Sequence, residues 1–538
     1  MKYLSETATA IACMGGFIFG YDTGVISGVL VMPTFPKTFG ISSAEAANVQ
    51  GNVVALLQVG CCVGALFVNF VAGMLPILFC FMLIRSVRRL LSSDEMILTP
   101  NAALLTDYFG RKKAIFLSAL IYIVGGIIQV VSAGNLNLLI GGRFIAGVGI
   151  GASSMLVPMY IAEISPKKLR GRLGTLWQFL IVLGICISYW VDYGCLRGFA
   201  ASDIQWQLAL GLQIVPGAIL AGGILFMPES LRWLASHGRH DIARRTLAQL
   251  RNLGESDHAV TEEMEEIQRA IDLERESSTG KFFEILQPSN LRRLLIGIMM
   301  QTFQQWTGSN AINYYAPNIF RSIGIQSTEI DVLATGVYGC IKVAFVFASF
   351  FLIDGKLGRR RTLMIGSLIM CIAFYLLGTM TKTIAAQNGG TISATASVGA
   401  LGYAAIIMVY LFAIGYELSW GPIVWIVCSE IYPTRIRAVC LSITTAFNWA
   451  HNAIIGKVTP IMLSNITWGT YFVFGTFGII MGLFVFFFLP ETRGVSLEEI
   501  DKVFSGGIFV FNNRYTPKEN SVAENSNSSD FEDVKASV

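Results

Sequence analysis

The chain has 538 residues, of which 54% are hydrophobic and only 14% are charged. A soluble globular domain carries about 25% charged residues, so a mean hydropathy of +0.60 leaves too little polar surface to cover a water-soluble particle of this size. The formal net charge of +4 gives no indication of nucleic-acid binding, and the composition favours a protein that lies in the lipid bilayer.

Long apolar runs recur along the chain. A transmembrane helix needs about 20 mostly apolar residues, and twelve runs approach that length. They cover residues 7–31, 48–72, 114–132, 138–160, 174–192, 207–227, 293–315, 332–353, 362–380, 400–428, 439–462 and 468–489. A soluble stretch at 229–290 divides them into six and six. We therefore predict an all-α membrane protein of twelve transmembrane helices in two six-helix halves, 1–228 and 291–504, with a short cytosolic helical linker.

The basic residues fall on one side of this arrangement. Lys and Arg gather in the loops at 111–113, 167–172, 230–293, 356–361, 435–437 and 493, whereas the alternate loops are poor in them. The positive-inside rule places the basic loops in the cytosol, so both termini are expected there. The first run contains Asp22 and is long, which indicates a first span rather than a cleavable signal peptide.

The linker at 229–290 is strongly charged, yet it keeps apolar residues at helical spacing, for example Ile242, Leu247 and Leu250. This pattern predicts several short amphipathic helices on the cytosolic surface; the alternative is a solvated segment without regular structure. The tail at 505–538, rich in Ser, Asn and acidic residues, is predicted to be disordered. The ten cysteines form no CxxC pair or Cys/His cluster, so no disulfide framework, metal or cofactor is expected.

Three polar motifs occur in the same order in both halves. DYFGRKK at 107–113 corresponds to DGKLGRRR at 354–361, and EISPKKLRGR from Glu163 corresponds to EIYPTRIRA from Glu430. PESLRWL from residue 228 corresponds to PETRG from residue 490. Each half is therefore interpreted as one six-helix repeat. Parallel repeats of this kind are a recurrent transporter plan, with the substrate held near the midplane between them.

Basic side chains of these motifs lie at predicted helix ends, beside carboxylates. Charge-assisted pairs between helix ends can hold the two halves together on the cytosolic side and must open when the cavity faces inward. The alternative is that these charges only set the topology. The residues predicted to form this cytosolic gate are Asp107, Arg111, Glu163, Arg170, Glu229, Arg232, Asp354, Arg359, Arg360, Glu430 and Arg437.

Taken in order, the motifs resemble the sugar porter family of the major facilitator superfamily, with fungal-type monosaccharide transporters as the nearest kind. The resemblance runs from FGYDTGVISG in the first span through GRFIAGVGIGA, QQWTGSNAINYY and GPIVWIVCSEIYPTRIR to PETRG after the last span. One departure is Leu231, where the family usually has Pro, and we expect little effect there. The resemblance implies a major facilitator fold that works by alternating access.

The resemblance also implies a set of sugar-binding side chains. Sugars need amides that both donate and accept hydrogen bonds, together with aromatic faces against the ring. The family's positions fall on Gln178, Gln304, Gln305, Asn310, Trp425 and Asn452. For each of them the alternative is an interhelical hydrogen bond that holds the bundle together, and this alternative weighs most at Asn452.

Lys342 breaks the family pattern, because it occupies a place in the eighth span where the family often has Asn. A lysine within a span is energetically expensive and usually faces a cavity or a partner. One interpretation is contact with an acidic or strongly hydroxylated substrate, which keeps a quinate-like acid open as the substrate. The other is a structural pair with an intramembrane carboxylate such as Glu417.

The chain contains no GxxxxGK[ST] segment, so ATP hydrolysis is not expected and transport must be downhill or ion-coupled. Asp22 in the first span and Arg143 in the fourth match positions that form a proton-responsive pair in proton-coupled sugar porters. The alternative is a permanent structural ion pair, and some family members with this Asp are plain facilitators. We favour symport, because an intramembrane carboxylate is functional by default.

Residues 73–106 do not fit the family pattern, in which the second span runs directly into the D-x-x-G-R motif. Their apolar part, 74–84, is too short to span a membrane and is broken by Pro76. Our hypothesis is that this stretch is a translated, unspliced intron; the alternative is a real cytosolic insertion.

Codon degeneracy permits splice signals at the ends of this stretch. Gly73-Met74 can be encoded by GGTATG, which contains a donor-like GTATG, and Thr106-Asp107 by ACAGAT, which contains an acceptor AG. Leu98-Thr99 can encode CTAAC, which resembles a branch point. Cutting at the two ends restores the codon of Asp107 and the family junction.

The predicted function is secondary active transport of monosaccharides, hexose or pentose, by proton symport at the plasma membrane. The alternatives are a facilitative uniporter, a carrier of a polyol or quinate-like acid, and a transporter-like sugar sensor, against which the short tail argues. The expected partners are the sugar, a proton and the lipid bilayer, and we expect a monomer. An enzyme is not expected, because no nucleophile, base or metal constellation appears.

Overall fold

The computed structural model describes residues 4–69, 110–132, 134–166, 170–199, 202–276, 284–323, 327–352, 357–387, 399–433, 436–493 and 504. These residues form α-helices, and they contain no β-strand. The whole anomalous stretch at 73–106 and the tail at 505–538 therefore lie outside the described residues.

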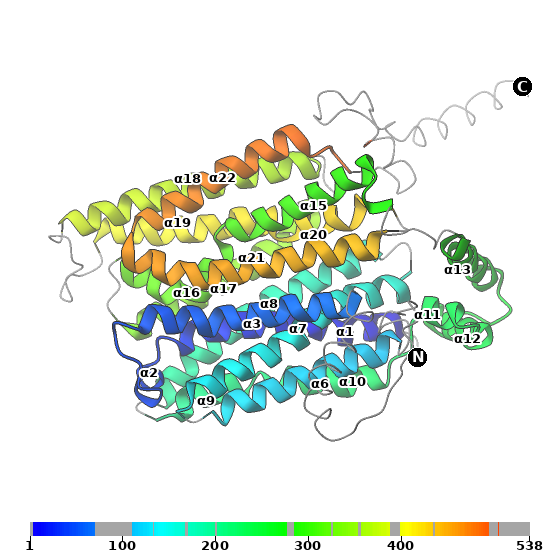
Figure 1. The fold of residues 1–538 in the computed structure, drawn as a ribbon, viewed down its shortest axis with the longest axis horizontal. Helices are drawn as coiled ribbons and strands as arrows, with labels where there is room; N and C mark the ends of the chain where they lie inside the picture. Colours follow the sequence, from blue (N-terminus) through cyan, green and yellow to red (C-terminus); the bar gives the residue numbers. More distant parts are fainter. Residues whose placement is uncertain are drawn as a thin grey trace, which may run out of the picture.

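The first half of the chain forms helices that run side by side along the long axis of the molecule (Figure 1). Their bounds are α1 Leu4–Val29, α2 Thr34–Thr38, α3 Ala46–Asn69, α6 Arg111–Val130, α7 Leu136–Ile164, α8 Arg170–Gly198, α9 Ile204–Gly211 and α10 Ile214–Leu225. The short helix α2 caps one end of the bundle, and α9 continues into α10 as one crossing.

The linker lies at the end of the bundle opposite α2 (Figure 1) and contains α11 Leu231–Ser236, α12 His240–Arg251 and α13 His258–Glu276. The amphipathic helices predicted from the sequence are confirmed in α12, where Leu247 and Leu250 are buried. Ile242, however, is 50% exposed, and its neighbour Ala243 turns inward in its place.

The second half repeats the long-helix pattern (Figure 1). Its helices are α15 Pro288–Trp306, α16 Ser309–Ser322, α17 Thr328–Leu352, α18 Arg359–Gln387, α19 Ala400–Glu417, α20 Trp420–Glu430, α21 Arg437–Asn465 and α22 Gly469–Phe488. The predicted seventh run at 293–315 is not one helix, because it breaks between α15 and α16 at Gly308, whose φ is +85°. Only glycine adopts such a conformation at little cost.

Within the described residues, ten helices or helix pairs are long and apolar enough to cross a membrane. The other two predicted crossings are the broken pair α15–α16 and the helix α21. Polar residues lower the hydropathy of both, for example Gln304 in α15 and Asn448 in α21. Together these elements account for the twelve predicted crossings.

The outer surface of α6 carries a stripe of apolar side chains at intervals of three or four residues. Leu117, Leu120, Val124, Ile127 and Val131 at its end are each at least 38% exposed. In water this stripe would be buried against another element, whereas in a bilayer lipid chains cover it. The surface therefore suits a protein whose solvent is lipid.

Glycines allow α3 and α7 to pack closely. A Cβ at Gly60 or Gly64 of α3 would collide with the carbonyl oxygens of Phe144 or Val148 of α7. Small residues at such crossings let the backbones of membrane helices approach. Across the two halves, α3 packs on α21 and α8 packs on α17, which leaves a central space lined by helices from both halves.

Candidate functional site

A cavity lies in the middle of the bundle between the two halves. It is lined by Phe19 and Thr23 of α1, Gln178, Ile181, Val182 and Ile185 of α8, Gln304 and Gln305 of α15, Asn310 and Asn313 of α16, Lys342 of α17, Tyr416 and Glu417 of α19, Gly421 and Trp425 of α20, and Asn448 of α21. The cavity brings together six of the seven predicted substrate-binding residues; Asn452 is the exception.

Three of the predicted side chains have unused hydrogen-bonding capacity at this cavity. Gln178 and Trp425 make no side-chain hydrogen bond with any described residue, although both border the cavity. The amide oxygen of Gln305 accepts a bond of 2.6 Å from Asn310 Nδ2, whereas its Nε2 has no partner among the described residues. An amide on α8, an amide on α15 and an indole N–H on α20 can therefore bond to a hydroxylated molecule from different sides.

Gln304 has a different arrangement, because its amide joins three helices. Its Nε2 donates to the carbonyl oxygens of Trp420 and Gly421 over 2.8 and 3.1 Å, and its Oε1 accepts from Asn448 Nδ2 over 2.9 Å. The interhelical alternative considered for this residue is thus present in the structure. Gln304 still borders the cavity and fixes the position of Asn448.

A chain of amides leads from Gln305 to Lys342. Asn310 Oδ1 accepts from Asn313 Nδ2 over 3.1 Å, and Asn313 Oδ1 accepts from Lys342 Nζ over 3.0 Å and from the Tyr338 hydroxyl over 3.2 Å. Asn313 and Tyr338 were not among the predicted residues. Asn313 lies three residues after Asn310 and hence on the same helix face, which is the sequence signal that could have identified it.

Lys342 forms an ion pair with Glu417, with 3.1 Å between Nζ and Oε1. The side chains are 2% and 0% exposed, and both residues line the cavity. The structural pair that the sequence left open is therefore present. Glu417 itself was considered only as a partner for the lysine, whereas the structure makes it part of the cavity wall.

Asn452 lies away from the cavity, in a hydrogen-bonded triangle. Its Oδ1 accepts from the Tyr314 hydroxyl over 3.0 Å, and that hydroxyl in turn accepts from Gln58 Nε2 over 2.8 Å. Asn452 Nδ2 closes the triangle at 3.4 Å from Gln58 Oε1. The amide of Asn452 is therefore occupied by α3 and α16, and Asn448, one turn earlier on α21, lines the cavity instead.

Asp22 and Arg143 form a fully buried ion pair between α1 and α7. Arg143 donates from Nη1 to Asp22 Oδ1 over 2.7 Å and from Nε to the Val53 carbonyl over 3.3 Å. Asp22 Oδ2 makes no hydrogen bond with the described residues. The pair is not part of the cavity wall, but Thr23, the residue after Asp22, is.

The predicted gate residues of the first half meet where α6 begins and α7 ends. Arg111 pairs with Glu163 at 3.1 Å, and Glu163 also accepts from the Ser230 hydroxyl. The carboxylate of Glu229 accepts from the backbone N–H groups of Lys112 and Ser230 over 3.0 and 2.9 Å. A carboxylate at a helix N-terminus satisfies free N–H groups and interacts favourably with the helix dipole.

The second half repeats this arrangement where α18 begins and α20 ends. Arg359 pairs with Glu430, as Arg111 pairs with Glu163. Glu491 accepts from the backbone N–H groups of Arg359 and Arg360 over 2.9 and 3.1 Å, as Glu229 accepts from that of Lys112 in the first half. The duplication read from the motifs therefore extends to the hydrogen bonds.

The other predicted gate residues lie outside these two clusters or outside the described residues. Asp107 and Asp354 lie outside the described residues, and Arg170 opens α8 but its side chain is outside them as well. Arg232 lies in α11. Arg437 opens α21 and donates to the Tyr432 carbonyl over 3.2 and 3.1 Å.

The ion pairs Arg111–Glu163 and Arg359–Glu430, at the end of the bundle opposite α2, each join residues of one half. Contacts at the α2 end, in contrast, join residues of different halves. Arg197 Nε lies 3.0 Å from Glu329 Oε1, Lys457 Nζ donates to Asn52 Oδ1 over 2.8 Å, and Asn318 Nδ2 donates to Gln50 Oε1 over 3.3 Å. The Tyr189 hydroxyl donates to the Asn313 carbonyl over 2.9 Å, beside the cavity. The halves are therefore joined on the side of the cavity that faces α2, and a further contact between them, from the Ser442 hydroxyl to the Ala65 carbonyl over 3.3 Å, lies toward the opposite end.

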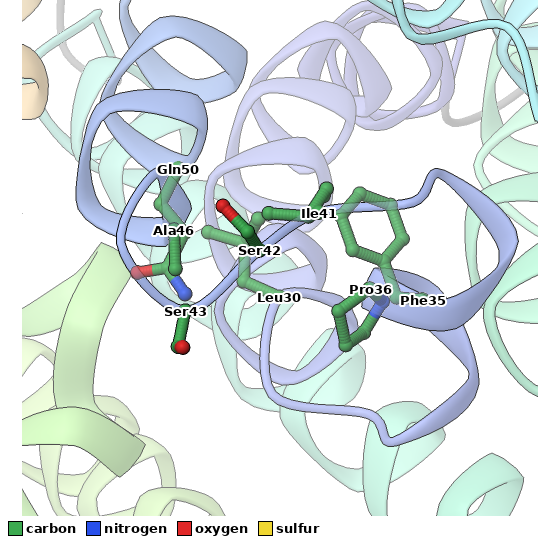
Figure 2. A pocket seen from close by; sticks show the side chains of 8 residues that line it. All are labelled: Leu30, Phe35, Pro36, Ile41, Ser42, Ser43, Ala46 and Gln50. Carbon is green, nitrogen blue, oxygen red and sulfur yellow. The ribbon is translucent and has the colours of Figure 1, made fainter.

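A second pocket lies at the α2 end, between the end of α1, α2 and the start of α3 (Figure 2). Its wall consists of Leu30, Phe35, Pro36, Ile41, Ser42, Ser43, Ala46 and Gln50. None of these side chains is charged, and only three are polar. The central cavity has the denser set of donors and acceptors, so we assign the functional site there.

Comparisons with known proteins agree with this geometry. The model of the family "Sugar (and other) transporter" matches residues 8–84 and 101–504. The chain is 31% identical to a quinate permease of Neurospora africana (93% of this chain and 88% of the relative). It is 34% identical to the MFS glucose transporter mfs1 of Aspergillus flavus (92% and 89%) and 31% identical to hexose transporter 2 of Kluyveromyces lactis (93% and 82%).

Solved structures extend the likeness to the whole fold. The partially occluded inward-open xylose transporter XylE from E. coli aligns with a TM-score of 0.71 at 28% identity, over 92% of this chain and 99% of that chain. The proton:xylose symporter XylE bound to 6-bromo-6-deoxy-D-glucose aligns with a TM-score of 0.72 at 27% identity, over 93% and 99%. These matches confirm the predicted twelve-helix major facilitator fold.

Proposed function

The chain belongs to the sugar (and other) transporter family, and from this membership we propose that it takes up a monosaccharide, a hexose or pentose, together with a proton. The observation that carries the proposal is the wall of the central cavity. Gln178, Gln305 and Trp425 present free hydrogen-bonding groups there, from both halves of the bundle. Hydroxyl groups of a sugar both donate and accept, which suits such amides.

The buried pair of Asp22 and Arg143 supports proton coupling. A carboxylate within a membrane span is expensive unless it is paired or protonated, and this one has a free oxygen next to a cavity-lining residue. The related XylE is a proton:xylose symporter. The rival function is facilitative uniport, in which Asp22 remains paired and no proton moves.

A second candidate substrate is a polyol acid such as quinate. Relatives named quinate permeases are 31% identical to this chain, and Lys342 places a cation in the cavity wall. This candidate competes with a neutral sugar for the same cavity.

Alternating access accounts for the contacts at the two ends. We propose that the clusters around Arg111–Glu163 and Arg359–Glu430 form the cytosolic gate, although in this structure each ion pair joins residues of one half rather than the two halves to each other. The contacts between the halves at the α2 end support a state that is closed toward the outside. In this arrangement the basic ends, the linker and both termini face the cytosol, and the protein acts as a monomer in the plasma membrane.

The boundaries proposed from the sequence follow the same plan, with halves at 1–228 and 291–504, a linker at 229–290 and a tail at 505–538. The family match leaves out residues 85–100, which lie inside the anomalous stretch at 73–106. This gap supports an insertion at 85–100, whereas the match includes 73–84 and 101–106, the remaining parts of the stretch.

The test is uptake of labelled hexoses, pentoses, polyols and quinate in a host that lacks its own sugar transporters, with and without residues 73–106. Symport predicts that the medium becomes more alkaline when sugar is added and that a protonophore abolishes accumulation. Sugar accumulation that is unchanged by the protonophore would contradict symport. Uptake that stops when the sugar concentrations inside and outside are equal would favour uniport. No uptake of any sugar by either version would contradict the proposed function itself.

A further inference from the structure

Among the described residues, Lys342 and Glu417 are the only charged ones in the wall of the central cavity. All the other lining side chains are neutral amides, hydroxyls, aromatic rings or aliphatic groups. One ammonium and one carboxylate sum to no net charge. The ion pair of Asp22 and Arg143 also has no net charge, and neither residue lines the cavity.

The lysine is held firmly in this pair. Its Nζ lies 3.1 Å from Glu417 Oε1 and donates to Asn313 Oδ1 over 3.0 Å. The rings of Tyr338 and Tyr416 have their centroids 5.6 and 5.7 Å from the same nitrogen, at a distance where an aromatic face attracts a cation. An ammonium has three donors, and protein groups already accept from two of them. The positive charge is therefore already paired and does not need an anionic ligand.

The carboxylate of Glu417 is less satisfied. Its Oε1 is paired with Lys342 Nζ, whereas its Oε2 makes no hydrogen bond with the described residues, although the side chain is fully buried. An ionised carboxylate only accepts hydrogen bonds, so it attracts hydroxyl donors and repels a second carboxylate.

A charged ligand would upset this balance. Buried charges are tolerated when they are paired, and one left without a partner is strongly destabilising. A sugar acid in the cavity would add a negative charge beside Glu417, and an amino sugar would add a positive charge beside Lys342. A neutral sugar leaves the pair intact and can bond to both of its members.

We propose that the Lys342–Glu417 pair is a charge filter, which admits uncharged polyols and excludes polyols that carry a carboxylate or an ammonium group. The proposal rests on the transport function proposed above and decides between its two candidate substrates in favour of the neutral sugar. Lys342, which in the sequence alone pointed toward an acid, acts in the opposite sense because Glu417 already neutralises it.

The test uses three ligands that differ only at carbon 6: glucose, glucuronate and 6-amino-6-deoxyglucose. Each competes with labelled glucose for uptake by the wild-type carrier and by two variants. In the wild type, unlabelled glucose should inhibit at least about tenfold more strongly than either charged analogue. This preference is the first prediction of the filter.

The two variants should change selectivity in opposite directions. Glu417→Gln leaves Lys342 without its counter-charge, so glucuronate should gain roughly tenfold in relative inhibition by supplying the missing charge. Lys342→Asn leaves Glu417 alone, so 6-amino-6-deoxyglucose should gain instead. The double variant has neither of these two charges, so neither glucuronate nor 6-amino-6-deoxyglucose should gain in relative inhibition.

The outcomes separate the filter from the transport function. Failure of the wild type to take up labelled glucose would contradict the proposed hexose transport. Uptake with equal inhibition by all three ligands would overturn the filter, as would variants that reach the membrane and keep the wild-type order of inhibition. Because the two single variants give mirror-image predictions, either one alone decides the question if the other fails to fold.

Discussion

Arg143 holds Asp22 across the interface of α1 and α7, with 2.7 Å between Nη1 and Oδ1 and no exposure of either side chain. The next residue of α1, Thr23, lines the central cavity. Occupancy of the cavity can therefore act on the pair through two adjacent residues of α1. This relationship is the structural basis of the coupling proposed here.

Asp22→Asn should abolish accumulation of sugar against its gradient but spare exchange of labelled for unlabelled sugar. The amide has nearly the same shape as the carboxylate but cannot carry a proton. Losing one partner of a buried pair costs about 3–5 kcal/mol of stability, so the amount of protein in the membrane must be measured. Accumulation and exchange are compared in the same vesicles.

The matched control for this change is Asp241→Asn on α12, because Asp241 is exposed on the linker. The same chemical change there should leave accumulation unaltered. If Asp22→Asn accumulates sugar as the wild type does, Asp22 is not the proton carrier.

Gln305→Ala and Gln304→Ala should separate substrate binding from stability. Gln305 Nε2 has no partner among the described residues and its Oε1 accepts one hydrogen bond, from Asn310, so its loss should raise KM about tenfold and lower stability less than the loss of Gln304 does. Gln304 joins Trp420, Gly421 and Asn448 by three hydrogen bonds, so its loss should lower the stability by about 2–3 kcal/mol. Uptake kinetics and melting in detergent measure the two effects.

The opposite pattern, with Gln305→Ala unstable and Gln304→Ala stable but weak in binding, would contradict the assignment of these neighbouring amides. An equal loss of both properties in both variants would mean that the two residues act as one unit.

The sequence predicted the crossings well, because membrane spans are defined by local hydropathy. It did not predict that the seventh crossing breaks at Gly308 or that α19 ends before α20 begins. Such breaks depend on single backbone conformations, which leave the apolar content of a run almost unchanged.

The site was predicted only in part, for a related reason. The resemblance pointed to amides of α8 and α15 that line the cavity, but on α21 it pointed to Asn452, whereas Asn448, one turn earlier on the same helix, lines the cavity. The network of Asn313, Lys342 and Glu417 joins residues of three helices, and no pattern in one segment can reveal such contacts.

The mature transcript should lack the codons for residues 73–106. The family match breaks at 85–100, inside this stretch, and the flanking codons permit a donor and an acceptor. Sequencing the transcript from the source cells checks the prediction directly. A mature message that retains these codons would refute the intron hypothesis, and a carrier that loses its uptake when they are removed would show that they are functional.

Gly358→Ala should destabilise the carrier by about 2–3 kcal/mol, which combines strain at positive φ with loss of a charged cap. Gly358 precedes α18 with a φ of +74°, and a Cβ there would lie 2.5 Å from Glu491 Oε2. That carboxylate caps the first N–H groups of the helix, so the methyl group would both strain the backbone and displace the cap.

Gly222→Ala in α10 is the matched control, because a Cβ at that position meets no atom within 4 Å. The substitution should leave stability unchanged or raise it by up to about 1 kcal/mol, since alanine favours a helix. Gly110→Ala should behave like Gly358→Ala, because Gly110 has a φ of +87° and faces Glu229 in the same way. Melting in detergent measures the stability of each variant. If Gly110→Ala and Gly358→Ala differ in stability, the two halves do not share the same capping arrangement at the ends opposite α2, and the duplicated motif has diverged in function.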